Sequence, residues 1–371
     1  MTTTMEDLSA RTISDELKAA ADKIPEFIVS ADSHVDEPVD LWHGLADDIR
    51  AEIPERIPFP PGTRPEGGAD PKIRTEHMDL DGISAEVLYP TAALKLFELG
   101  QKAQEAAFPI YNDWVAEYCK TAPKRLFAVP CLAVYDIDHA VKELQRCHKM
   151  GLKGGLVWQV PHPDLPVMSD HYEKLWSAAE EMGAVINFHI LTGYNYKKGL
   201  GGGINYKAGT DAKDKSATER MRGSVNIKTS DAVTTLFELI FSGVFERHPK
   251  LKVELVESEI GWMPFVLQQW DYYYNRNFRP GGAHAEYNIS RLPSEIFAEH
   301  VYATFMDDQV GAQLLKTWGE RNCMWSSDYP HGNMTWPNSR AFLAKQIGDL
   351  PRDKQERLLS KNVVELYNLE V

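Results

Sequence analysis

Short apolar runs alternate along this chain with longer amphipathic stretches. Eight of the runs have the length of a buried strand and are bounded by turn-forming residues. They cover residues 27–32, 85–90, 126–134, 153–160, 184–190, 252–258, 300–306 and 323–328. Between them, apolar residues recur at helical spacing, which predicts helices over residues 103–122, 136–150, 169–183 and 231–249.

Strands that alternate with crossover helices predict an α/β fold with a parallel sheet. Eight such units predict a closed (β/α)8 TIM barrel. A doubly wound open sheet is the alternative. It is less favoured because no glycine-rich nucleotide-binding motif follows any of the strands.

Three connections are too long for ordinary βα loops: residues 36–84, 191–229 and 259–299. The first two follow strand C-termini, where barrel enzymes carry active-site loops, so we expect them to cover the mouth of the barrel. The third contains the aromatic stretch "GWMPFVLQQWDYYYNRNF", which favours an oligomer contact. We therefore expect an N-terminal helix or arm over residues 1–26 and a single barrel domain over residues 27–371.

Composition excludes several classes of partner. The chain has 371 residues, of which 43% are apolar and 25% charged, as in soluble globular proteins. Its formal net charge of −14 argues against a nucleic-acid partner, since phosphate binding needs clustered Lys and Arg. No apolar run approaches the length of about 18 residues that a membrane span needs, and the first residues lack a signal-peptide pattern. A cytoplasmic protein without a membrane partner is the expectation.

Polar residues stand where the predicted strands end. The first strand ends in Asp32-Ser33-His34, and alternate strand residues share a face, so Asp32 and His34 project into one space. His189 ends the fifth strand and Glu257 the sixth. The eighth run, within "WSSDYPHG", ends in Asp328 and is followed by His331.

In a barrel these strand ends converge on one mouth. Carboxylates aimed at one dry point repel one another unless a cation lies between them. The neighbouring imidazoles complete a mixed nitrogen and oxygen set that suits Zn, Mn or Fe. The pattern therefore predicts a metal centre, although each strand-end Asp or His taken alone is more typical of a cap or a turn.

Five longer segments carry a resemblance to a known family: "SADSHVDEPVDLW" (30–42), "HMDLDGISAEVLYPT" (77–91), "NFHI" (187–190), "VFERHPKLKVELVESEIGWMP" (244–264) and "WSSDYPHGNMTWP" (325–337). The chain resembles the amidohydrolase-related family of metal-dependent (β/α)8 enzymes. Within it, the chain is similar to the branch of aminocarboxymuconate-semialdehyde decarboxylase, resorcylate decarboxylases and meta-cleavage-product hydrolases. The resemblance extends from about residue 27 to the end.

The resemblance implies one or two divalent ions (Zn, Mn or Fe), with Asp32, His34, His189 and Asp328 as ligands. Two departures from the family pattern stand out. The first strand has Asp-x-His rather than His-x-His, which favours oxygen-loving Mn or Fe. Glu257 occupies the end of the sixth strand, where many members carry a catalytic histidine, so the usual acid or base cannot be carried over.

Three functions remain open. The first is hydrolysis or non-oxidative decarboxylation of a small organic molecule, expected to bear a carboxylate, by metal-activated water or a metal-polarised carboxylate, with Asp328 or Glu257 moving protons. The second is a dinuclear Fe or Fe/Mn monooxygenase, in which Glu257 and His331, with Glu76 or His77, hold a second ion. The third is a non-catalytic barrel that partners an active homologue. Family frequency favours the first, whereas the surplus of carboxylates favours the second.

Substrate contacts are harder to assign, because substrate identity is determined by loops rather than by the metal ligands. His162 follows the fourth strand, and Arg74 lies in a mouth-side excursion, so both are candidates. We expect the partners to be a small-molecule substrate and either a second copy of this chain or a homologous barrel. The same excursions hold further cationic candidates at Lys197, Lys198, Arg220 and Arg222.

Overall fold

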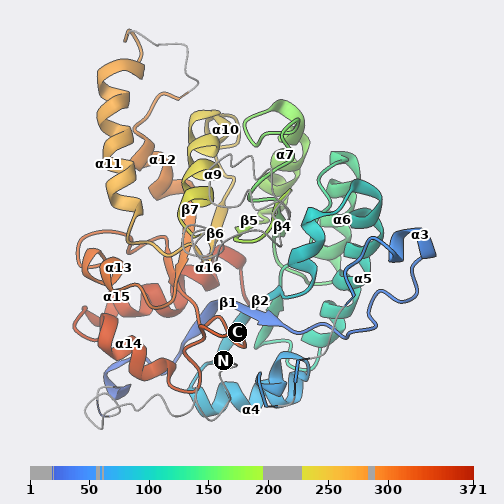
Figure 1. Cartoon of the computed structure of the whole chain (residues 1–371). Helices are drawn as coiled ribbons and strands as arrows, with labels where there is room; N and C mark the ends of the chain where they lie inside the picture. Colours follow the sequence, from blue (N-terminus) through green and yellow to red (C-terminus); the bar gives the residue numbers. More distant parts are fainter. Residues whose placement is uncertain (1–18, 20, 56–58, 61, 195–227, 283–288) are drawn as a thin grey trace, which may run out of the picture.

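The computed structural model describes residues 19, 21–55, 59–60, 62–194, 228–282 and 289–371. Within them, eight short strands alternate with helices (Figure 1). The strands are β1 (Val29–Val35), β2 (Ala85–Pro90), β3 (Leu126–Ala128), β4 (Gly155–Val157), β5 (Ile186–His189), β6 (Val253–Val256), β7 (Val301–Phe305) and β8 (Cys323–Trp325). Each lies inside or beside one of the eight predicted apolar runs.

All neighbouring strands pair in parallel and in sequence order, β1 to β3 in one sheet and β4 to β8 in another. Backbone hydrogen bonds join the sheets at both seams. Leu132 N donates to Leu156 O (3.0 Å) after β3, and Asp328 N donates to Asp32 O (3.1 Å) beside β1. His34 N also donates to Tyr329 O (2.6 Å). The predicted (β/α)8 architecture is confirmed.

Helices surround the strands (Figure 1). The longer helices between successive strands include α4 (Pro71–Asp81), α5 (Gln101–Cys119), α6 (Ile137–Lys149), α7 (Glu173–Met182), α9 (Ser230–Phe241), α11 (Met263–Tyr273) and α12 (Pro293–His300), with the short α10 (Val244–Arg247) and α13 (Gln309–Leu314). The short helix α3 (Asp47–Arg50) lies in the first excursion. The chain ends in α14 (Ser339–Ile347), α15 (Arg352–Glu356) and α16 (Asn362–Tyr367).

Helix α4 is a difference from the sequence prediction, which treated residues 36–84 as loop. The Asp70 side chain accepts hydrogen bonds from the backbone N–H of Lys72 and Ile73, and Pro71 fixes the first helical residue. Gly82, with φ 73°, ends the helix in the left-handed region. The excursion is thus a long mouth-side loop followed by the regular crossover helix between β1 and β2.

The aromatic stretch forms helix α11 (Met263–Tyr273), which continues as a π-helical turn over Tyr274–Phe278. In Figure 1 this helix stands away from the barrel. Phe265, Tyr272 and Tyr273 are 66%, 57% and 49% exposed. This apolar surface is where we expect an oligomer contact.

The barrel interior contains a buried polar network as well as apolar side chains. The Tyr367 hydroxyl, from α16, lies 2.5 Å from Asn187 Oδ1 and also contacts the Glu254 carboxyl group, and its single proton is donated to one of the two. Tyr89 also donates to Asn187 Oδ1 (2.9 Å). All four side chains are buried, so they form a polar core that helix α16 completes.

Other predictions fall partly or wholly outside the described residues. The arm expected over residues 1–26 is described only at residue 19 and from Ala21 onward, and the glycine-rich excursion only at its two ends. Lys197, Lys198, Arg220 and Arg222 lie in the part that is not described. None of the described helices has both the length and the hydropathy of a membrane span.

Candidate metal centre

Strand β1 presents the first two predicted ligands. Its pairing with β2 shifts register between Ser30 and Ser33, so β1 is irregular just where Asp32 stands. Asp32 and His34 are both fully buried, and Asp32 Oδ1 lies 3.4 Å from His34 Nε2. The two side chains meet inside the barrel, as their alternation along the strand predicts.

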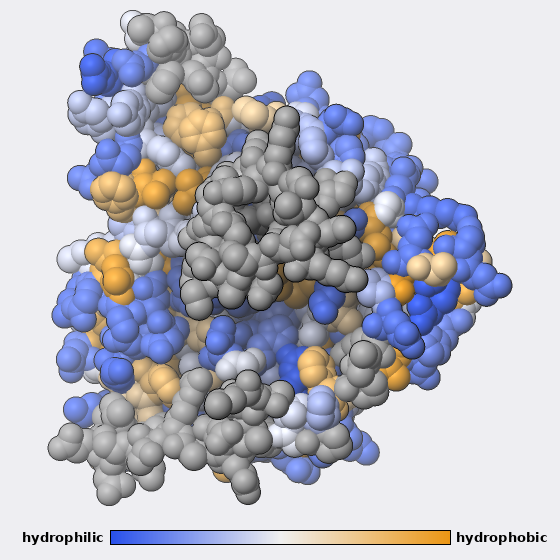
Figure 2. All heavy atoms as spheres, viewed as in Figure 1, coloured by the Kyte–Doolittle hydropathy of each residue, from blue (hydrophilic) through white to orange (hydrophobic). Residues whose placement is uncertain are grey.

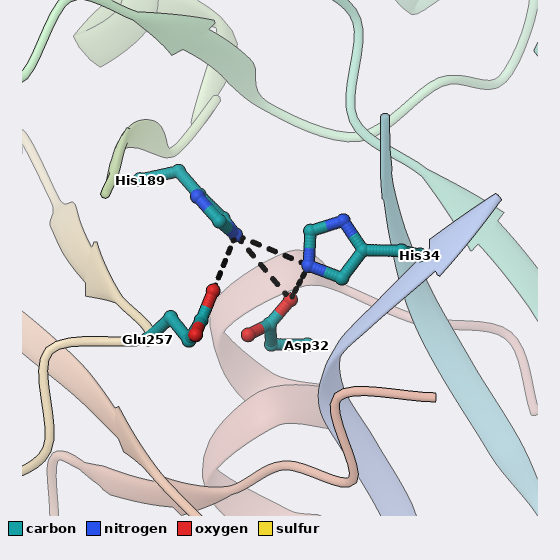
Figure 3. Close-up of side chains that lie close together, drawn as sticks. All are labelled: Asp32, His34, His189 and Glu257. Carbon is teal, nitrogen blue, oxygen red and sulfur yellow. Dashed lines mark hydrogen bonds and ion pairs between the residues drawn. The ribbon is translucent and has the colours of Figure 1, made fainter. Parts of the chain in front are cut away.

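The end of β5 supplies the third. His189 Nε2 lies 3.3 Å from His34 Nε2, 3.8 Å from Asp32 Oδ1 and 3.7 Å from Glu257 Oε2. Figure 3 shows Asp32, His34, His189 and Glu257 pointing at a common centre. Four side chains from β1, β5 and the end of β6 therefore converge.

The segment after β8 adds Asp328 and His331. Asp328 Oδ1 lies 3.5 Å from His34 Nε2 and 2.9 Å from His331 Nδ1. The His331 ring stacks on His34 with 3.8 Å between the ring centres. On its other side, His331 Nε2 lies 3.1 Å from the hydroxyl of Thr91, which follows β2.

These side chains form two overlapping groups able to hold an ion. One comprises Asp32, His34, His189 and Glu257. The other comprises His34, Glu257, Asp328 and His331. In each group the candidate ligand atoms all lie within 4.8 Å of one another. The structure therefore brings together the four predicted ligands and two of the four candidates for a second ion.

Backbone carbonyls orient the two central histidines. Pro90 O lies 2.7 Å from His34 Nδ1, and Ile190 O lies 2.6 Å from His189 Nδ1. A carbonyl can only accept, so each Nδ1 carries the proton and each Nε2 turns a lone pair toward the cluster. This is the second-shell arrangement typical of metal-binding histidines.

The electrostatics of the cluster favour a cation. Burial, with Asp328 and Glu257 nearby, raises the pKa of Asp32 well above its usual range. Burial lowers the pKa of His189 to about 4, and burial followed by Asp328 raises the pKa of Glu257 to about 7. Among the described residues, neither carboxylate oxygen of Asp32 has a hydrogen-bond partner. A positive ion would satisfy these buried oxygens and offset the repulsion, so the residues present fit a divalent metal.

The backbone turns sharply where the strands end. Leu191, Glu257 and Asp328 have φ of 68°, 58° and 53°, in the left-handed region that residues other than glycine seldom adopt. Each follows a strand whose end contributes to the cluster. Such strain persists only where surrounding contacts impose it, and it is common at functional sites.

Lys228 is a site residue that the sequence did not reveal. Its Nζ lies 3.3 Å from Glu257 Oε1 and 3.5 Å from Glu259 Oε1. Burial lowers the pKa of Lys228, but Glu257 and Glu259 offset this, and the net change is upward. The residue lies near the end of the glycine-rich excursion 191–229, where no periodic pattern indicates which side chain faces the mouth.

Arg74 has a different place from the one predicted. It is fully buried, and its Nε donates to Glu86 Oε2 (2.5 Å) while Nη1 donates to His34 O (2.7 Å). The guanidinium therefore binds the backbone of β1 and the side chain of Glu86, and it does not face the mouth of the barrel. The sequence predicted that Arg74 contacts the substrate. Its position in the structure corrects this and gives Arg74 a structural role beside β1.

Glu76 and His77 also lie outside the cluster. Glu76 is exposed on α4. His77 Nδ1 lies 2.7 Å from the Tyr329 hydroxyl, and its ring packs 4.7 Å from Trp336. The expectation that either residue helps to hold a second ion is corrected by this placement.

His162 lies beyond the end of β4 and is half-buried. Its ring packs against Tyr194, which follows β5, with 4.1 Å between the ring centres. Its predicted contact with substrate stays a prediction.

A parallel barrel with carboxylates and imidazoles gathered at its strand ends defines a class of metal-dependent (β/α)8 enzymes. The chain belongs to the amidohydrolase family, whose model matches residues 34–369. The family predicted from the sequence motifs is thereby confirmed.

Two similar curated proteins are decarboxylases. Gamma-resorcylate decarboxylase of Rhizobium sp. is 25% identical over 308 residues, which cover 79% of this chain and 86% of that protein. The 2-amino-3-carboxymuconate-6-semialdehyde decarboxylase of Dictyostelium discoideum is 23% identical, over 81% of this chain and 77% of that protein.

A solved structure shares the fold. The 5-carboxyvanillate decarboxylase of Novosphingobium aromaticivorans, with bound manganese and a nitrobenzoic acid ligand, superposes with a TM-score of 0.71. It is 16% identical, and the match covers 92% of this chain and 97% of that one.

Proposed function

We propose that the protein catalyses the metal-dependent, non-oxidative decarboxylation of a small aromatic carboxylate. The observation that carries the proposal is the convergence of His34 and His189 on Asp32, a buried carboxylate with no hydrogen-bond partner in the described part of the chain. The relatives named above, which are decarboxylases of carboxylated compounds, support this reaction over hydrolysis and over oxygenation.

The proposed ligands are Asp32, His34, His189 and Asp328. A bound Mn, Zn or Fe ion would supply the positive charge that polarises a substrate carboxylate and stabilises charge developing on the ring. Manganese is the first metal to test, because it is bound in the similar 5-carboxyvanillate decarboxylase. The two carboxylates in this set also favour Mn or Fe over Zn.

The other side chains of the cluster are proposed to bind the substrate and to move the proton. Lys228 places a positive charge beside the acidic groups, where it can attract and orient an anionic substrate. Replacing a carboxylate on a ring by hydrogen requires one proton at the carbon that loses CO2. Glu257, whose pKa burial raises to about 7, can hold that proton near neutral pH, and we assign its delivery to the Glu257 carboxyl.

One observation favours a second candidate function. The group His34, Glu257, Asp328 and His331 could hold a second ion beside the first. In that case Glu257 would be a ligand rather than a proton donor. A dinuclear oxygenase is the function that such a centre would support.

The test begins with elemental analysis of protein purified without added metal. The metal-free protein is then loaded with Mn, Zn or Fe, and CO2 release from hydroxybenzoates is measured under nitrogen and in air. We expect one ion per chain and equal CO2 release in both atmospheres. Two irons per chain with O2 consumption would replace this proposal with the oxygenase. Bound metal without any turnover would favour the non-catalytic partner.

Four further expectations belong to the same proposal. The substrate is a small molecule, and residues 27–371 act as one catalytic domain. The exposed aromatic face of α11 contacts a second copy of the chain or a homologous barrel. The protein works in the cytoplasm.

A further inference from the structure

A cavity of about 300 Å³ lies between the first excursion and the segment that follows β2. Its inner wall is formed by Trp42, Ile53 and Leu96, which are only 4%, 5% and 2% exposed. The Trp42 indole N–H is already used, because it donates to Ala107 O (3.0 Å). The wall therefore offers an apolar surface with no unsatisfied indole donor.

One end of the cavity adjoins the candidate metal centre. Thr91 lines the cavity, and its hydroxyl lies 3.1 Å from His331 Nε2. His331 Nδ1 lies 2.9 Å from Asp328 Oδ1, one of the proposed ligands. Thr91 and His331 thus link the cavity to the proposed ligand Asp328 through two successive side-chain contacts.

The floor of the cavity is held by a buried carboxylate. Glu37, just after β1, accepts hydrogen bonds from the backbone N–H of Ala92 (2.8 Å) and Ala93 (3.0 Å). Ala93 begins the 3-10 helix η3 (Ala93–Glu98), so the bonds tie the start of this helix to the β1 segment. The Ala92 methyl group is consequently fixed where it lines the cavity.

The opposite end of the cavity is open and more polar. Lys95 and Glu55 line it and are exposed, and Phe59 is 46% exposed. Figure 2 shows hydrophobic atoms among hydrophilic ones on this side of the molecule, where α3 lies in Figure 1. An apolar interior with a polar rim and one polar contact at its inner end is the usual composition of a small-molecule site.

We propose that this cavity binds an apolar arm of the substrate, so that the substrate is an aromatic carboxylate with an extended alkyl or aryl substituent. The reacting end lies at the metal centre, and the arm extends past Thr91 between Trp42 and Leu96. This assignment rests on the proposed function for the reacting end alone. The preference for an apolar arm follows from the cavity itself.

Binding of two phenols to the manganese-loaded full chain tests the proposal. Resorcinol and 4-hexylresorcinol share a ring and differ by an apolar chain, and calorimetry gives the affinity and stoichiometry of each. We expect one 4-hexylresorcinol per chain, bound at least about ten-fold more tightly than resorcinol. The series A92V, A92L and A92F, which fills the cavity in steps, should bring that ratio progressively toward one.

The matched control is A298F, because Ala298 is exposed on α12 and remote from the lining residues. It should keep the wild-type ratio. Thermal melting identifies any Ala92 variant that fails to fold, and the milder A92V and A92L then carry the test. Equal affinities in the wild type, or an unchanged ratio in folded A92L, would overturn the proposal.

The result for the cavity can be distinguished from the result for the proposed reaction. If no carboxylate is decarboxylated but the ten-fold ratio is present and declines along the Ala92 series, the cavity assignment stands and the reaction fails. If hydroxybenzoates are decarboxylated but the two phenols bind equally, the reaction stands and the cavity assignment fails.

Discussion

His34 and His189 direct their Nε2 atoms at one another, 3.3 Å apart, from strands on different sides of the barrel. Both rings are fully buried, and a backbone carbonyl holds the Nδ1 proton of each. Burial lowers the pKa of both imidazoles, so they are neutral at physiological pH. Two imidazole nitrogen lone pairs directed at the same space beside a carboxylate favour the binding of a cation.

Replacing His189 with alanine should therefore release the metal. We expect the metal affinity of H189A, purified like the wild type, to fall at least about ten-fold, because the variant lacks one of the four proposed ligands. Elemental analysis and competition with a chelator measure this. H148A, which alters an exposed histidine of α6, should keep its metal. Equal metal content in H189A would contradict the proposed centre.

Removing the charge of Lys228 should weaken substrate binding more than metal binding. K228M takes away the cation that lies 3.3 Å from Glu257. We expect the KM for an anionic substrate to rise about ten-fold, in line with the loss of one charge-assisted hydrogen bond. Steady-state kinetics of metal-loaded enzyme measures it. K316M, on the exposed surface, is the control, and an unchanged KM in K228M would remove Lys228 from the substrate site.

Glu254 should make stability depend on pH. Burial raises its folded-state pKa to about 8, whereas a Glu in an unfolded chain titrates near ~4.3. The folded state therefore holds the proton more tightly, so this contribution is complete below ~4.3 and is lost as the pH rises through about 8. In E254Q nothing titrates at this position.

The measurement is urea unfolding of wild type and E254Q between pH 5 and pH 9. The free energy of unfolding of the wild type should fall relative to that of E254Q, by about 1.4 kcal/mol for each pH unit in the steepest range. E370Q, which changes an exposed carboxylate, should follow the wild type. Parallel curves for wild type and E254Q would show that Glu254 is not protonated in the folded protein.

The buried pair of Arg74 and Glu86 should behave as a unit. R74M leaves the Glu86 carboxylate buried without its cation, which should cost about 3–5 kcal/mol of unfolding free energy. The double variant R74M/E86Q removes both charges and should recover a large part of that loss. Urea unfolding of the four variants in the cycle measures the coupling, and additive losses would contradict it.

The strands and the convergence of the proposed ligands were predictable because their signals are local. Each strand is a short buried run, and the runs that carry the proposed ligands reach polar residues at or near their ends. β2 matches its predicted run residue for residue. β3 is shorter than predicted, ending at Ala128, since Pro130 cannot donate to the ladder although its neighbours stay buried. The apolar pattern of the sequence therefore predicts which residues are buried better than it predicts which residues pair in the sheet.

What the sequence did not show depends on contacts between distant segments. Arg74 was placed at the mouth because it is charged and lies in an excursion, but its burial depends on Glu86 of β2. The start and stop signals of α4, at Asp70 and Gly82, are local, but they stand in a Pro-rich and Gly-rich passage typical of a loop. Lys228 has no local signal, because its neighbours Glu257 and Glu259 lie in another loop.

The seam of the barrel has a consequence for biosynthesis. The hydroxyls of Ser30 and Ser327, 297 positions apart, meet there at 3.1 Å, next to Asp32 on one strand and Asp328 after the other. A nascent chain on the ribosome thus holds the first proposed ligands almost from the start and the last only near the end of translation. Binding of the ion by the complete ligand set would accordingly follow closure of the barrel, and a chain terminated just before Asp328 would carry only three of the four proposed ligands.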